Sequence, residues 1–125
     1  MRIERAEQLI LIISDDPAAA KIAEQALTAL DREVVVARAV DWALTTIARQ
    51  FPALILIDLE LPNEGLDRLA AALQTPPEGE LAMLAGFSNR SVRPPAALEL
   101  AERLDKPLQR HAVADCATRL LRRRN

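Results

Sequence analysis

Several residue types that often mark a chemical site are scarce in this chain of 125 residues, which has one cysteine, three glycines and one histidine. The single cysteine, Cys116, excludes an internal disulfide and is consistent with a reducing compartment. Three glycines leave no Gly-rich loop of the kind that cradles phosphates. His111 lies far in sequence from any catalytic partner, so we expect it on the solvated surface.

Charge and hydropathy exclude two further classes of protein. The net charge is only -2, which gives no general attraction to nucleic acid or to an anionic membrane. No apolar run reaches the roughly 18 residues that span a bilayer, and residues 1–5 lack the pattern of a signal peptide. Half of the residues are hydrophobic, which suffices for a real core. We therefore expect one cytoplasmic domain over residues 1–125, without direct contact to nucleic acid or membrane.

The chain alternates between apolar runs and amphipathic stretches, which predicts strands and helices in turn. The expected strands are Leu9–Ser14, Glu33–Ala37, Ala53–Asp58, Leu81–Ala85 and a weak one at Glu102–Leu104. The expected helices are Pro17–Leu30, Val40–Gln50, Gly65–Leu73, Pro94–Ala101 and Leu108–Arg123. Strict alternation favours an α/β fold, a flavodoxin-like doubly wound five-stranded parallel sheet of order 2-1-3-4-5 with five helices.

Acidic residues follow two of the expected strands. Asp15 and Asp16 come after the first strand, and Asp58 ends the third. The order 2-1-3-4-5 places strands 1 and 3 side by side, so Asp15 should lie next to Asp58 at the edge where such folds bind ligands. Carboxylates that meet need a cation or a proton, and hard oxygen ligands favour Mg²⁺. Lys106, after the fifth strand, would reach the same edge, and the three parts together predict a phosphoryl-acceptor site.

At this point the chain resembles the receiver domain of two-component response regulators. The resemblance covers nearly the whole length and rests on four blocks, Leu11–Pro17, Pro52–Pro62, Met83–Ser88 and Asp105–Leu108. It implies that Asp58 is the phosphoacceptor, and that Asp15, Asp58 and the backbone carbonyl of Glu60 hold Mg²⁺. It also implies that Lys106 contacts the acceptor or the phosphoryl group and precedes a cis peptide to Pro107.

The resemblance further implies a signalling module, not an enzyme. Asp58 would take a phosphoryl group from a histidine kinase or phosphotransfer protein. The signal would pass by protein–protein contacts to a downstream partner or to an output domain missing from this chain, and a homodimer is a further option.

The chain also departs from the family pattern. Aligned on Pro17, the first of the two usual acidic positions is Ser14, and Asp16 becomes the helix N-cap. A shift of one residue would restore an Asp15–Asp16 pair but would displace Pro17. The loop after Pro62, Asn63-Glu64-Gly65, is about one residue shorter than usual.

The switch positions of the family differ as well. The position of the usual Thr or Ser that ends the fourth strand falls on Ala85, which has no hydroxyl, and the sequence does not place Ser88 in the site. The usual switch aromatic, three residues before Lys106, falls on Arg103. These departures predict a switch that is broken or rewired.

Two alternative functions follow. Ser14 and Ala85 motivate a pseudo-receiver, a protein interaction module that acts without phosphorylation. A flavin protein or an aspartyl phosphatase on the same fold is a third option. The absence of a Gly-rich loop and of an Asp-x-Asp nucleophile motif argues against it.

Overall fold

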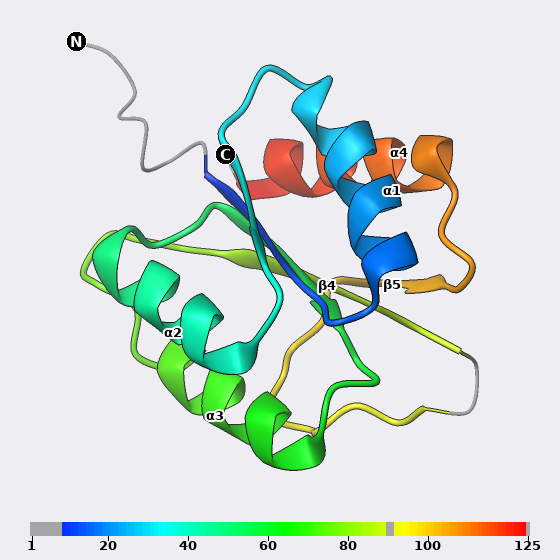
Figure 1. The fold of residues 1–125 in the computed structure, drawn as a ribbon. Coiled ribbons are helices and arrows are strands. Elements are labelled where there is room, and N and C mark those ends of the chain that lie inside the picture. The colour runs from blue at the N-terminus through cyan, green and yellow to red at the C-terminus, as the bar shows by residue number, and fades with distance from the viewer. Residues whose placement is uncertain (1–8, 90–91, 125) are drawn as a thin grey trace, which may run out of the picture.

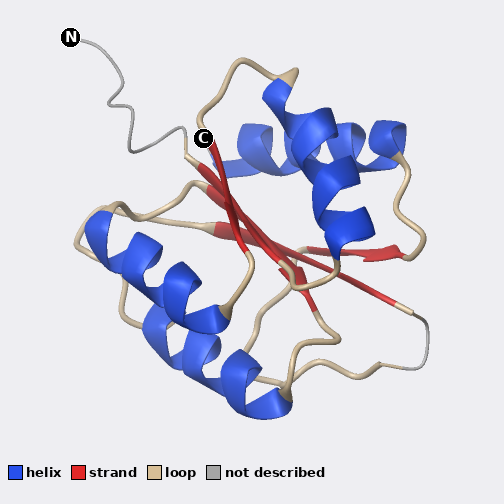
Figure 2. Cartoon of the chain, viewed as in Figure 1, coloured by secondary structure: helices blue, strands red, loops and turns tan. Residues whose placement is uncertain are grey.

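The computed structural model describes residues 9–89 and 92–124; the expectation about residues 1–5 lies outside this range. The elements follow one another in the order β1 (Ile10–Ile13), α1 (Pro17–Thr28), β2 (Val34–Ala37), α2 (Val40–Arg49), β3 (Leu54–Asp58), α3 (Asn63–Leu73), β4 (Met83–Ser88), β5 (Glu102–Asp105) and α4 (Arg110–Arg124). Strands and helices form three layers, with α1 and α4 on one face of the sheet and α2 and α3 on the other (Figures 1 and 2).

The sheet is parallel throughout, and its strand order is β2-β1-β3-β4-β5. This is the predicted flavodoxin-like order, so the fold class is confirmed. In the register, Ile13 lies opposite Ile57, and Asp58 lies opposite Phe87. The carboxyl ends of β1, β3 and β4 therefore meet at one edge of the sheet, where Asp58 ends its strand.

Two of the three interior strands, β1 and β3, form because their residues can be buried on both faces. Every residue of β1 and β3 is buried, as expected for a parallel sheet covered by helices on both sides. Alternate residues face different cores. Leu56 belongs to the core under α1 and α4, whereas Ile55 and Ile57 belong to the core under α2 and α3.

The helix α1 begins as the sequence predicts. The Asp16 side chain caps it by accepting hydrogen bonds from the backbone N–H groups of Ala18 and Ala19, and Pro17 occupies its first turn. An N-cap carboxylate typically contributes about 1 kcal/mol to stability. The same carboxylate is thereby held at the carboxyl edge of the sheet.

The expected helix at Pro94–Ala101 is wrong: this segment contains only a turn, with Leu98 N–H donating to the Pro95 carbonyl at 3.1 Å. Two prolines supply no backbone N–H, and too few residues remain to offset the cost of nucleating a helix. The segment still covers the sheet, because Leu98 is buried and Leu100 contacts the same core. The described residues therefore form four helices, not the expected five.

The fourth strand also differs from its expected range. It runs over Met83–Ser88 instead of Leu81–Ala85, and Phe87 is fully buried. Gly86 permits this continuation, since a Cβ there would lie 2.8 Å from a Leu59 methyl carbon and 2.9 Å from one of Leu100. The shift moves the end of β4 by three residues and changes which side chain reaches the site.

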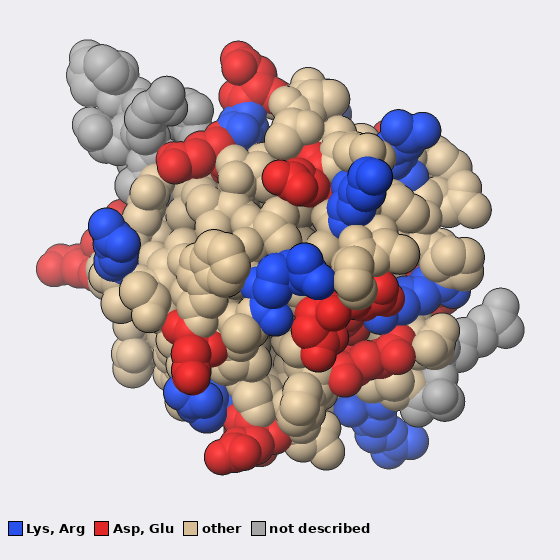
Figure 3. Space-filling model, in the orientation of Figure 1, with Lys and Arg blue, Asp and Glu red and all other residues tan. Residues whose placement is uncertain are grey.

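The surface agrees with the small net charge. Acidic and basic side chains are interspersed on the face seen in Figure 3, without a broad field of one sign. No helix among the described residues has the length and apolar character needed to cross a membrane.

The core makes a direct prediction about stability. We expect Leu56→Ala to lower the free energy of unfolding by about 2–5 kcal/mol, because Leu56 is 1% exposed and its truncation leaves a cavity. Leu81→Ala is the matched control, since Leu81 is 53% exposed, and a change of about 0.5 kcal/mol or less is expected there. Urea unfolding measures both values, and equal losses would contradict the assignment of the core.

Candidate functional site

Asp58 is a fully buried carboxylate at the end of β3. Its Oδ1 accepts a hydrogen bond from the Glu60 backbone N–H at 3.0 Å. Its Oδ2 accepts one from the Ser14 hydroxyl at 2.8 Å, because the register of β1 with β3 sets Ser14 beside it. A buried carboxylate needs such donors, since its desolvation is costly.

Lys106 supplies the opposite charge. It follows β5, and its Nζ lies 3.0 Å from Asp58 Oδ2, 3.1 Å from Asp16 Oδ2 and 3.4 Å from Glu60 Oε2. The Lys106–Pro107 peptide is cis, as the resemblance implied. The ammonium also lies 5.7 Å from the centroid of the Phe87 ring, within reach of a cation–π interaction. Three carboxylates thus converge on one ammonium.

The site shifts two pKa values. The hydrogen bond from Lys106 lowers the pKa of Asp16 against the opposing effect of its partial burial. Burial disfavours the charged ammonium of Lys106, but its bonds to Asp58 and Asp16 outweigh this effect and raise the pKa of Lys106. Both groups are therefore charged at neutral pH.

The structure brings together most of the predicted site residues. Asp58 and Lys106 lie in contact, and Glu60 reaches Lys106 with its side-chain carboxylate, whereas the expectation named its backbone carbonyl. Asp15 is exposed and makes no side-chain hydrogen bond or ion pair within the described residues. Asp16 contacts Lys106 while capping α1. The alignment on Pro17 agrees with this arrangement, because Ser14 faces Asp58 and Asp16 caps the helix.

The hydroxyl position of β4 requires a correction. Ala85 lies opposite Leu56, two residues before the level of Asp58, so it does not end the strand. Ser88 does, and its hydroxyl accepts a hydrogen bond from Arg103 Nη2 at 2.6 Å and donates one to the Asn89 carbonyl at 2.8 Å. The prediction that this edge lacks a hydroxyl is wrong. The position of Ser88 could be recognised only once the register of β4 with β3 was known.

Sequence reasoning also missed the side chain of Glu60. Its Oε2 accepts a hydrogen bond from the Asn89 backbone N–H at 3.0 Å, which ties the segment after β3 to the end of β4. Asn89 directly follows Ser88, so this bond fixes the backbone beside the hydroxyl. The acidic residue two positions after Asp58 was the signal for this contact.

The oxygen atoms available at the site are of the chemical type that a hard cation binds. The site offers carboxylate oxygens of Asp16, Asp58 and Glu60 beside the exposed Asp15, and such oxygens are the ligands that Mg²⁺ takes. In this arrangement the ammonium of Lys106 already occupies the centre of the carboxylates. Within the described residues no three acidic, His or Cys side chains form a metal-binding group on their own. A metal would therefore need water and backbone ligands beside Asp15 and Asp58.

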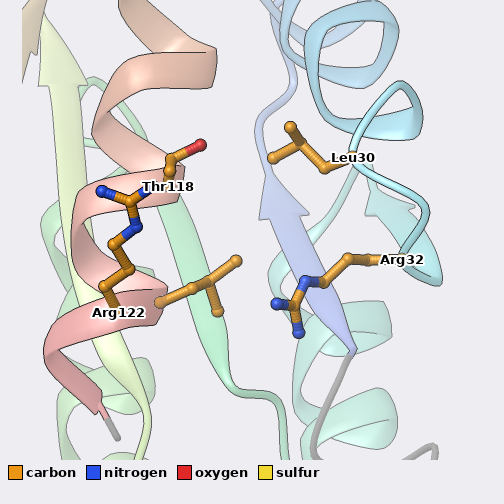
Figure 4. Close-up of a pocket in the computed structure, with 5 residues that line it drawn as sticks. Leu30, Arg32, Thr118 and Arg122 are labelled. Carbon is orange, nitrogen blue, oxygen red and sulfur yellow. The ribbon is translucent and has the colours of Figure 1, made fainter.

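A cavity of about 360 Å³ opens above the site, and Asp16, Glu60, Asn89 and Lys106 contribute to its wall. Figure 4 shows a different hollow, between the turn after α1 and the helix α4, where Thr118 and Arg122 face Leu30 and Arg32. That hollow holds no acidic or nucleophilic group comparable to Asp58. The cavity beside Lys106 is therefore the candidate functional site.

With this geometry established, the known structures give a consistent result. A receiver domain (CheY-like) from Methanospirillum hungatei JF-1 has a TM-score of 0.73 and 24% identity, covering 94% of this chain and 95% of that chain. One from Methylobacillus flagellatus has a TM-score of 0.74 and 23% identity, covering 90% and 98%.

A longer structure matches in part. NtrX from Brucella abortus, in complex with ADP, has a TM-score of 0.76 and 22% identity over 93% of this chain, but the match covers only 26% of that chain. No protein-family model and no curated protein match the sequence. At these identities the likeness establishes the fold: the chain folds as receiver domains do, as the four sequence blocks predicted.

The bond between Ser14 and Asp58 predicts the effect of restoring the acid. In Ser14→Asp, two carboxylates would lie at hydrogen-bond distance in a buried site, so we expect a loss of about 3 kcal/mol of stability at pH 7 without divalent ions. Millimolar Mg²⁺ should recover part of this loss. Ser14→Asn, of equal size and uncharged, is the control and should not respond to Mg²⁺. Thermal unfolding with and without Mg²⁺ measures both effects. If Mg²⁺ does not change the stability of Ser14→Asp, the placement of position 14 beside Asp58 is contradicted.

The ion pairs of Lys106 predict a pH-dependent cost. The pKa of Asp16 is lowered by Lys106, so this contact stabilises the fold above the ordinary Asp pKa of about 4 and is lost as the pH falls through the lowered value. Lys106→Met also leaves the buried Asp58 charge uncompensated. We expect a loss of about 3–5 kcal/mol near pH 7 that shrinks below pH 4, as carboxylates become protonated.

Urea unfolding between pH 3 and pH 8 measures this dependence. Lys21→Met, at an exposed position of α1, is the control and should cost little at any pH. A loss for Lys106→Met that does not change with pH would show that Lys106 acts by packing alone.

Proposed function

We propose that this chain is a phosphoacceptor receiver that takes a phosphoryl group onto Asp58 from a histidine kinase or phosphotransfer protein. The observation that carries the proposal is the bond between Lys106 Nζ and Asp58 Oδ2, 3.0 Å long and joining residues 48 apart in sequence. It sets a nucleophilic carboxylate and a cation together at the carboxyl edge of the sheet. Such a pair can accept and neutralise a phosphoryl group.

The proposed step forms a bond between an Asp58 oxygen and phosphorus while the bond from phosphorus to the donor nitrogen breaks. The leaving imidazole takes up a proton, and the acyl phosphate remains on Asp58. Lys106 neutralises charge on the phosphoryl oxygens, and the Glu60 backbone N–H holds the carboxylate in position. The product is a modified protein, so the chain acts as a signalling module and not as an enzyme.

Mg²⁺ belongs to the same proposal. Asp15, Asp58 and the Glu60 carbonyl would hold it, and when bound it would supply further positive charge beside the phosphoryl oxygens. Ser14 contributes a neutral donor where an acid would bring a second charge. We therefore expect Mg²⁺ to bind more weakly here than at a site with a full acidic pair.

One observation favours the pseudo-receiver as a second candidate. Asp58 is fully buried, and Ser14, Glu60 and Lys106 together donate three hydrogen bonds to it. A carboxylate satisfied in this way needs no phosphoryl group or metal for stability. In that case the domain would bind partners through its surface without phosphorylation.

Partners follow from the leading proposal. A histidine kinase or phosphotransfer protein would supply the phosphoryl group in the cytoplasm. The signal would pass to a downstream protein, to an output domain carried elsewhere, or to a second copy in a homodimer. No direct contact with nucleic acid or membrane is part of this proposal.

Phosphorylation is tested by incubating the domain with Mg²⁺ and acetyl phosphate, with intact mass as the readout. We expect an adduct of one phosphoryl group that Asp58→Asn abolishes and that Lys106→Met reduces by about 10²-fold in rate, because the charge on the transferring group is no longer neutralised. Removal of Mg²⁺ by a chelator should also suppress the adduct.

Asp105→Asn is the matched control, since Asp105 likewise ends a strand but makes no ion pair among the described residues. It should be phosphorylated at the normal rate. No adduct on the wild-type protein, from acetyl phosphate or from a panel of kinases, would favour the pseudo-receiver.

A further inference from the structure

Arg103 joins the end of β4 to the segment that follows it. Its Nη2 donates to the Ser88 hydroxyl at 2.6 Å and to the Asn89 carbonyl at 3.2 Å, and it also contacts the Val92 carbonyl. A single guanidinium nitrogen thus serves three acceptors with two hydrogens. These contacts hold Val92 close to the edge of the sheet.

All three acceptors of Arg103 are neutral. Its side chain is exposed, and it has no carboxylate partner among the residues that the structure describes. Its other guanidinium nitrogens make no hydrogen bond within the same residues. Hydrogen bonds from a guanidinium to an anion are roughly twice as strong as those between neutral groups. The guanidinium therefore has N–H donors left for an anion, and hydrogen bonds to an anion would be stronger than its present bonds to neutral acceptors.

An anion would appear beside Ser88 if Asp58 became phosphorylated. Asp58 lies opposite Phe87, the residue before Ser88, and the Ser88 carbonyl accepts a hydrogen bond from the Lys106 backbone N–H at 3.0 Å. Phosphorylation replaces the single negative charge of the carboxylate with about two on the phosphoryl group. It also offers the Ser88 hydroxyl a stronger acceptor than the Asn89 carbonyl.

We propose that Arg103 is an anion-responsive latch, an inference that rests on the proposed function. While Asp58 is unmodified, the guanidinium holds Val92 and Asn89 through their carbonyls. A phosphoryl group on Asp58 draws the Ser88 hydroxyl and the guanidinium toward itself, and the carbonyl of Val92 is released. The latch is a positioning element, because Arg103 responds to the phosphoryl group after it has been transferred and acts on the segment 92–101.

The segment 92–101 is suited to respond. It contains no helix, and its internal hydrogen bonds are those of Leu98 N–H to the Pro95 carbonyl and of Leu100 N–H to the Leu98 carbonyl. Its far end is bound to the sheet by Ala101 N–H to the Leu84 carbonyl at 2.7 Å. Its near end is held by Arg103 at the Val92 carbonyl and by the longer bond from Val92 N–H to the Asn89 carbonyl at 3.3 Å. Segments with few backbone bonds open at low cost, so the loss of one anchor should be visible there.

Amide hydrogen exchange measured by NMR tests the latch, with beryllofluoride and Mg²⁺ as the phosphoryl mimic. We expect exchange at Leu98 and Leu100 to rise by about tenfold when beryllofluoride binds, while Ala101 stays protected. Arg103→Met in the free protein should show the same rise, and beryllofluoride should add little to it. Arg122→Met removes an exposed arginine of α4 and is the control that should leave exchange unchanged.

The outcomes separate the two proposals. Fluorine NMR reports beryllofluoride binding, and Asp58→Asn shows its dependence on the acceptor. Bound beryllofluoride with unchanged exchange at Leu98 overturns the latch and leaves the proposed function standing. No binding and no phosphoryl adduct overturn both. Unchanged exchange at Leu98 and Leu100 in free Arg103→Met also overturns the latch. The comparison of the wild-type protein with and without beryllofluoride does not depend on whether a variant folds.

Discussion

The contact of Lys106 with Asp58 is the constraint on which the rest of the site depends. A fully buried carboxylate must be compensated, and here a cation and two neutral donors share that task. The donors come from the segment after β1, the turn after β3 and the segment after β5. The carboxyl ends of these strands must therefore meet, so the condition that stabilises Asp58 is also the condition that assembles a reactive site.

Ser14 changes the balance of charge in this site. A second carboxylate beside Asp58 would require a metal or a proton, whereas a hydroxyl satisfies Asp58 Oδ2 directly at 2.8 Å. Among the described residues Lys106 is the only cation that pairs with the carboxylates of the site, and this pairing suffices to stabilise it. Under the proposed function a metal would be a partner in the chemistry and not a condition of folding, which is the physical difference between this chain and one with a full acidic pair.

Features that depend on neighbouring residues in the sequence were predicted well. The apolar runs of β1 and β3, the Asp16–Pro17 start of α1 and the strand order follow from burial, capping and connection rules. The end of β4 could not be found in this way, because a glycine interrupts the apolar run at position 86. The strand continues through Gly86 because Leu59 and Leu100 fill the space that a side chain would need there. The reach of Arg103 is equally non-local, since its acceptors lie 11 to 15 residues earlier.

The corrected register changes the meaning of the two departures at the switch positions. From the sequence, Ala85 indicated the loss of the usual hydroxyl and Arg103 the separate loss of the usual aromatic side chain. With Ser88 at the end of β4, the hydroxyl is present, and Arg103 is its hydrogen-bond partner. An aromatic side chain would couple to such a hydroxyl by moving between two packed positions, whereas a guanidinium couples by charge. A segment that lacks a helix suits this second mode, because one hydrogen bond from a charged donor can hold or release it without repacking a core.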